Sequence, residues 1–156
     1  MKRHFTFTKE RIINKFKEII TLEATPNALA LGVAIGILLA FIPLFGLEWL
    51  IVILIIFLVK DKINKVTLVA GLLVSNPFTA LPMNLFSYWV GRSLVGGPSS
   101  ITLSDDISAF TSQFASIAYP WYVGSLVTGL AFAVPAYLIT YYFAWLHKRK
   151  KQEAVK

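Results

Sequence analysis

Two ionisable side chains, Glu48 and Arg92, lie well inside the long apolar stretches of this 156-residue chain. A charge at membrane depth is costly, and it usually marks a functional site where it pairs with another charge or lines a wet cavity. Glu48 could act there as a counter-ion or proton carrier, and Arg92 or a helix N-terminus could attract an anionic group. Arg92 is only a few residues from the end of its stretch, so its side chain could instead extend to the interface. These two residues predict a substrate site.

Prolines interrupt both apolar stretches, at residues 41–48 (FIPLFGLE) and 75–82 (SNPFTALP). Hydrocarbon offers no water to backbone groups that a break leaves free, so broken helices persist in a membrane only where they are buried or line a cavity. A pair of such segments indicates a small-solute or ion site in transporters. We therefore expect a site where the two breaks meet. Its predicted substrate-binding residues are Glu48, Asn76, Thr79 and Arg92.

The polar residues of the second break also admit a structural interpretation. Asn76 can bond the backbone groups that Pro77 frees, and this role is at least as well supported as contact with a ligand. Ser75 and Thr79 admit the same two interpretations. Asn84 follows the break and could line the same cavity, although a structural role is favoured.

Small residues recur at every fourth position in two segments, at Ala28, Gly32, Gly36 and Ala40 and again at Ser125, Gly129 and Ala133. Such stripes let two helices approach closely, within one chain or between subunits, so we interpret them as structural. The predicted structural residues of the two broken stretches are Gly32, Gly36, Pro43, Gly46, Pro77, Pro82 and Gly91. Because the chain is small for a transporter, we also expect a homo-oligomer.

The composition is that of an integral membrane protein. Hydrophobic residues make up 56% of the chain and charged residues 15%, whereas charged residues make up about a quarter of a soluble domain. The net charge of +7 could suggest nucleic acid, but the basic residues lie almost entirely outside the apolar runs, as in a membrane protein. We therefore expect a lipid bilayer with anionic head groups as the partner, and no nucleic acid.

No sequence motif indicates an enzyme, a metal site or a cofactor. The chain has no cysteine, which excludes disulfides and thiolate metal ligands. His4 and His147 lie in basic flanking segments without a cluster of ligands around them. There is no phosphate loop, nucleophile elbow or pair of catalytic carboxylates, and no signal peptide follows Lys2 and Arg3. We expect a protein that is not an enzyme and binds no cofactor.

The elements that would position the site are all α-helical. As one helix the first apolar stretch would be about 48 Å long, against about 30 Å for the bilayer core, so we expect a hairpin or two short spans. The full prediction is a single membrane domain. It begins with an amphipathic surface helix at 8–24, followed by a proline-broken hairpin at 28–59 and an Asn-Pro-broken span at 66–94. An external amphipathic segment at 95–118, with a short helix capped by Ser104, then leads to one transmembrane helix at 119–146 and a basic cytoplasmic tail at 147–156.

Lysine and arginine positions predict the orientation. The N-terminal segment, the loop at 60–65 and the C-terminal tail are basic, whereas residues 95–118 contain no lysine or arginine. The positive-inside rule then puts both termini and the 60–65 loop in the cytoplasm, with residues 95–118 outside. The first stretch must then enter and leave on the cytoplasmic side, as a re-entrant hairpin or as two short spans, while the other two segments cross. We expect a multi-pass protein of the bacterial cytoplasmic (inner) membrane.

The two breaks also bear a family resemblance. The pattern Gly32-x-x-x-Gly36, Pro43-x-x-Gly46, Asn76-Pro77-x-Thr79-x-x-Pro82 and then Gly91 resembles a bacterial membrane family catalogued as domain of unknown function 2062, over residues 10–146. Members of that family tend to have a neutral polar residue or a histidine just after the Pro-x-x-Gly turn, where this chain has Glu48. Some relatives are fused to glycosyltransferase modules, and this implies a role in handling cell-envelope lipids or polyprenyl phosphates.

Two functions fit these observations. The first is transport or handling of an amphipathic anion, such as a phospholipid or a polyprenyl phosphate, at the two broken segments. The second is a non-transporting scaffold that anchors a cell-envelope enzyme through the basic helix at 8–24 and the small-residue stripes. In the second case the breaks would serve only to fold a short re-entrant hairpin.

Overall fold

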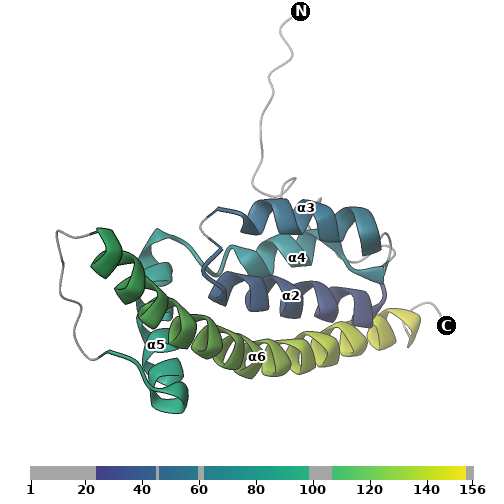
Figure 1. The fold of residues 1–156 in the computed structure, drawn as a ribbon. Coiled ribbons are helices and arrows are strands. Elements are labelled where there is room, and N and C mark those ends of the chain that lie inside the picture. Colours follow the sequence, from purple (N-terminus) through teal and green to yellow (C-terminus); the bar gives the residue numbers. More distant parts are fainter. Residues whose placement is uncertain (1–23, 45, 60–61, 99–106, 154–156) are drawn as a thin grey trace, which may run out of the picture.

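The computed structural model describes residues 24–44, 46–59, 62–98 and 107–153, except for the side chains of 107–112 and 151. Five helices and no strand occur in these ranges (Figure 1): α2 (Pro26–Phe41), α3 (Glu48–Val59), α4 (Lys65–Leu72), α5 (Pro77–Val95) and α6 (Ile107–Glu153). The predicted all-helical fold class is therefore confirmed for the described part of the chain. The predicted surface helix at 8–24 lies almost wholly outside the described residues, as does Ser104.

The first apolar stretch forms two helices around the first break. α2 begins at Pro26 because the Thr25 side chain caps it, with Oγ1 accepting from the backbone N of Ala28 at 3.2 Å. The helix ends just before Pro43, which cannot continue it. Gly46 then adopts a φ of +94°, a conformation that favours glycine, and α3 starts two residues later. α3 runs back in the opposite direction to α2, packed mainly across α4 (Figure 1).

Glycines let α2 and α4 pack backbone to backbone. A Cβ added to Gly32 would lie 2.6 Å from the carbonyl oxygen of Asn64, and one added to Gly71 would lie 2.6 Å from that of Val33. Gly36 meets the backbone of α4 in the same way. This contact explains the first small-residue stripe as a seam within the chain. Beside it lies a core formed by Leu39, Val52, Ile63, Leu68 and Leu72.

The second apolar stretch bends by 74° between α4 and α5. The predicted break at 75–82 is too long, because α5 already begins at Pro77 and continues through Pro82. Pro77 occupies the first turn, where its missing N–H has no helical partner to lose. Pro82 is exposed and removes one backbone hydrogen bond, which the helix tolerates. The irregular segment is therefore only residues 73–76.

α6 is a single helix of 47 residues that runs along both α2 and α5 (Figure 1). The sequence predicts a short helix within 95–118 that is separate from the helix at 119–146, whereas in the structure one continuous helix covers residues of both segments. Both Pro120 and Pro135 lie inside the helix. Pro120 is fully buried against α5, where Gly91 makes room for its backbone carbonyl. That packing favours a continuous helix over the break that a proline favours locally.

Within the described ranges, α6 is the one helix long and apolar enough to cross a membrane, over Gln113–Lys150. The bent pair of α4 and α5 would be a second crossing if its two parts form one span. α2 and α3 are apolar but shorter than a span.

Candidate functional site

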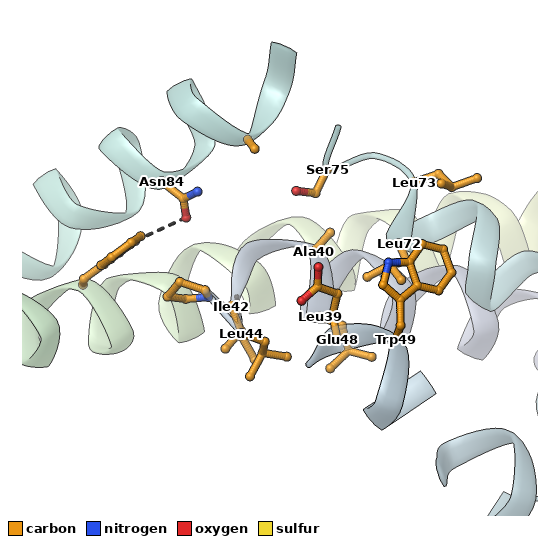
Figure 2. Close-up of a pocket in the computed structure, with 13 residues that line it drawn as sticks. Leu39, Ala40, Ile42, Leu44, Glu48, Trp49, Leu72, Leu73, Ser75 and Asn84 are labelled. Atoms are coloured by element: carbon orange, nitrogen blue, oxygen red, sulfur yellow. Dashed lines mark hydrogen bonds between the residues drawn. The ribbon is translucent and has the colours of Figure 1, made fainter. Parts of the chain in front are cut away.

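A cavity of about 220 Å³ lies between the two helix breaks (Figure 2). One wall comes from the end of α2, the first break and the start of α3, and the other from the end of α4, the second break and α5. The indole of Trp121 on α6 completes the lining. The lining residues are Leu39, Ala40, Ile42, Pro43, Leu44, Glu48, Trp49, Leu72, Leu73, Ser75, Ala80, Asn84 and Trp121. The structure thus brings the two breaks together around one cavity.

Glu48 is the charged residue of this lining. It is the first residue of α3, and its carboxylate oxygen Oε2 accepts a hydrogen bond from the backbone N of Gly46 at 2.7 Å. A carboxylate in the first turn of a helix is also favoured by the helix dipole. Oε1 makes no hydrogen bond to any described residue, and no described cation pairs with the carboxylate. Figure 2 shows the carboxylate directed toward the space between the breaks.

The opposite wall presents two neutral polar side chains, Ser75 and Asn84. The amide oxygen of Asn84 accepts a hydrogen bond from Nε1 of Trp121 at 3.3 Å, and this contact joins α5 to α6. The amide nitrogen of Asn84 and the hydroxyl of Ser75 have no hydrogen-bond partner among the described residues, and both side chains face the cavity (Figure 2). The cavity therefore has an acceptor on one wall and donors on the other.

Asn76 and Thr79 do not line the cavity, because their side chains cap α5. Oδ1 of Asn76 accepts from the backbone N of Phe78 at 3.0 Å and of Thr79 at 3.2 Å. Oγ1 of Thr79 in turn accepts from the backbone N of Asn76 at 2.9 Å and donates to the carbonyl of Val74 at 2.6 Å. This reciprocal arrangement is a capping box. Both residues thus have the structural role that the sequence left open.

Replacing Asn76 with alanine should lower the free energy of unfolding by about 1 kcal/mol, because two backbone N–H groups at the start of α5 lose their acceptor. Aspartate at the same position should cost much less, since its carboxylate can accept the same hydrogen bonds. Thermal unfolding of the two purified variants beside the parent protein checks this. Equal losses for alanine and aspartate would contradict the capping role.

Arg92 is not part of the cavity. It lies in the last turn of α5 and is exposed, and its carbonyl oxygen accepts from the backbone N of Gly96 at 3.0 Å. Eight residues separate it from Asn84, so the two positions are about 12 Å apart along the helix. The sequence predicts that Arg92 and Glu48 belong to one site, whereas in the structure only Glu48 lines the cavity.

Sequence reasoning missed the two tryptophans of the site. Trp49 follows Glu48 on α3, and Trp121 lies in α6 next to Pro120. A second α6 residue, Tyr122, fixes the first break in place, because its hydroxyl donates to the carbonyl of Pro43 at 2.9 Å. The aromatic pair Trp121 and Tyr122, directly after Pro120, is the sequence feature that could indicate these contacts. Their partners, Asn84 and Pro43, lie far away along the chain, so the sequence does not identify them.

The described residues contain no group of three or more histidine, cysteine, aspartate or glutamate side chains that could hold a metal ion. The chemistry of the cavity thus comes from one carboxylate, one amide, one hydroxyl and two indoles.

The described residues thus form a helical fold in which two broken apolar segments border one cavity with three polar side chains in its lining. Comparison with protein families identifies it further. Residues 9–153 match the model of a family described as "uncharacterized protein conserved in bacteria (DUF2062)", and the chain belongs to that family. A search of curated proteins found no match to the chain, and a search of solved structures found none either.

Proposed function

We propose that this protein is a multi-pass protein of the bacterial inner membrane that transports or handles an amphipathic lipid through the cavity between its two helix breaks. The observation that carries the proposal is that both breaks border one cavity, and that Glu48 faces it with a second oxygen that bonds to no described residue. Broken apolar helices that meet around polar groups are typical of solute sites near the middle of a membrane.

The outer surface of α3 supports the membrane location. Its outward residues are apolar and between 50% and 78% exposed, namely Leu50, Ile53, Leu54, Phe57 and Leu58. A continuous apolar face of this kind is unfavourable in water and suits lipid. α3 has 12 residues, which is about 18 Å of helix and too short to cross a core of about 30 Å. This length favours the re-entrant hairpin, one of the two arrangements that the loop charges predict.

The size of the cavity favours a head group as its occupant. A volume of about 220 Å³ corresponds to about seven water molecules at their liquid density. That space accommodates a small polar group but excludes acyl or prenyl chains, which would remain in the surrounding hydrocarbon. The lipid class remains that of the sequence-based proposal, a phospholipid or a polyprenyl phosphate.

Single cysteines test the proposal without background labelling, because the chain has no cysteine of its own. Ser75→Cys and Asn84→Cys in native membranes should react with a small water-soluble maleimide, since both side chains line the polar cavity. Leu85→Cys is the matched control. It is the next residue on α5 and is 61% exposed on a lipid-facing side, so it should react at least about tenfold more slowly.

When the same two variants are purified in detergent, added phospholipid should slow labelling at Asn84→Cys and leave Leu85→Cys unchanged. Fast labelling of Leu85→Cys in native membranes would mean that α5 is surrounded by water, and it would exclude the membrane proposal for this helix. In the same scan, Lys62→Cys should react only from the cytoplasmic side and Ser104→Cys only from outside, as the positive-inside rule requires.

The scaffold alternative depends mainly on the basic segment at 8–24, which lies almost wholly outside the described residues. The small-residue stripes, its other basis, are occupied by contacts within the chain. No observation from the described residues favours this second function.

A further inference from the structure

The charge of the cavity limits the class of lipid head group that it can bind. Glu48 is the one charged side chain among the described lining residues, and no lysine, arginine or histidine accompanies it. Glu48 is half-buried, and at the membrane depth that the proposed function gives it, a carboxylate is costly unless it pairs with a positive group or lines a wet cavity. Because Arg92 is elsewhere on α5, the chain's described residues do not supply that positive group. A ligand that provides one would bind in the place of the missing counter-ion.

The other lining groups favour an organic ammonium over a metal ion. Divalent cations require several oxygen ligands, usually more than one of them a carboxylate, and the described lining has a single carboxylate. Trp49 and Trp121 lie in the same cavity, and indole faces attract ammonium groups. Trp121 donates to Asn84 on the opposite wall, so Trp49 is the indole next to Glu48 along α3. A carboxylate in a cavity that also presents indole surface suits an amine.

The second wall suits a phosphate. The amide nitrogen of Asn84 and the hydroxyl of Ser75 are donors without partners among the described residues. Phosphate oxygens are strong acceptors, and neutral donors bind them without adding charge. An ammonium at Glu48 and a phosphate at Asn84 and Ser75 would together satisfy both walls.

We propose that the cavity binds a zwitterionic phosphoethanolamine head group, with the protonated amine at Glu48 and the phosphate at Asn84 and Ser75. This inference rests on the proposed function and specifies its lipid. The phosphoethanolamine group has eight heavy atoms, which matches the volume of about seven waters estimated for the cavity. Of the lipids considered above, this proposal favours an ethanolamine phospholipid. It disfavours a polyprenyl phosphate, which has no positive group.

The test compares two short-chain lipids in detergent, dihexanoyl phosphatidylethanolamine and dihexanoyl phosphatidylglycerol, with the full-length protein and isothermal titration calorimetry. The parent protein should bind the ethanolamine lipid about tenfold more tightly, since a charge-assisted hydrogen bond is gained. Glu48→Gln should remove this preference. The amide oxygen of the new side chain can still accept from Gly46, so the turn is retained and only the charge is lost.

Glu153→Gln is the control variant. That carboxylate is exposed on the last turn of α6 and pairs with Arg149, so its removal should leave the preference unchanged. The comparison of the two lipids on the parent protein does not depend on how well any variant folds.

The outcomes separate the two proposals. Equal binding of both lipids, or tighter binding of the glycerol lipid, would overturn the amine inference and leave lipid handling intact. Absence of binding by either lipid would overturn the proposed function itself.

Discussion

Replacing Gly124 with alanine should lower the midpoint of thermal unfolding by about 6–12 °C, which corresponds to about 3 kcal/mol in a protein of this size. Gly124 lies where α5 and α6 cross at their closest approach. A Cβ at this position would collide with the backbone carbonyl of Ser87 and would lie 2.6 Å from the backbone N of Gly91. Neither atom belongs to a side chain that could rotate away, so the two helices would have to separate.

Gly91 is the matching position on α5. A Cβ there would collide with the backbone carbonyl of Pro120, so Gly91→Ala should cost about as much as Gly124→Ala. Separation of the helices at this point would also strain the contact between Asn84 and Trp121, which lines the cavity. We therefore expect both variants to lose lipid binding together with stability.

Gly129→Ala on the same helix is the control. The nearest atom to its added Cβ is Cδ1 of Leu38, at 2.9 Å, which is the end of a flexible side chain. The midpoint should fall by less than about 3 °C, because Leu38 can adopt another rotamer. Thermal unfolding monitored by size-exclusion chromatography in detergent measures all three variants. A loss at Gly124 no larger than that at Gly129 would contradict the backbone contact between α5 and α6.

The sequence predicts the helical class and the breaks because both depend on local chemistry. Long apolar runs favour helices, and Pro43 and Gly46 follow the end of α2 and form the turn before α3. The second stripe was identified correctly as a packed surface, since Ser125, Gly129 and Ala133 are all buried. Its deepest contact, Gly124, was missed because it is one residue outside the four-residue spacing.

The boundaries around prolines could not be predicted from local rules. Pro82 and Pro120 both lie inside helices. Pro120 stays helical because α5 packs against it, and that neighbour comes from a part of the chain some thirty residues away.

Whether a helical residue lines the cavity depends on the direction in which its position faces around the helix. The sequence does not reveal which helix face points to the cavity. Arg92 follows Asn84 by eight residues, a rotation of about 80° and a rise of about 12 Å. Asn84 faces the cavity and Arg92 does not. A rule based on charge alone therefore selects Glu48 correctly as a lining residue but also selects Arg92, while the neutral Asn84 receives too little weight.

Replacing Thr128 with valine should destabilise the protein by about 2 kcal/mol, because it leaves a buried hydroxyl on the partner helix without an acceptor. Thr128 and Ser87 are 3% and 0% exposed, and their hydroxyl oxygens are 2.9 Å apart across the α5–α6 contact. Thr128 also donates to the carbonyl of Gly124 at 2.7 Å. Its proton is used there, so Ser87 is the donor between the two hydroxyls.

Because Ser87 is the donor, the two single variants should lose different amounts of stability. Ser87→Ala removes the donor but leaves Thr128 bonded to Gly124, so it should cost only about 1 kcal/mol. The double variant should cost less than the two single variants added together, by a coupling energy of about 0.6–1.7 kcal/mol for a hydrogen bond between membrane helices. Chemical unfolding of the four proteins measures the cycle, and a coupling energy near zero would show that the hydroxyls do not interact.

Ser125→Ala is the sharpest control for this cycle, because it removes a third hydroxyl from the same seam. Oγ of Ser125 is fully buried and has no hydrogen-bond partner among the described residues. Its deletion relieves an unpaired polar group and should leave the stability unchanged or slightly raised. A loss at Ser125 as large as that at Thr128 would mean that any shortened side chain weakens the seam by lost packing alone. A loss confined to Thr128 and Ser87 would instead assign the stability to their hydrogen bond, and thus to the contact that holds α5 beside α6 where both helices line the cavity.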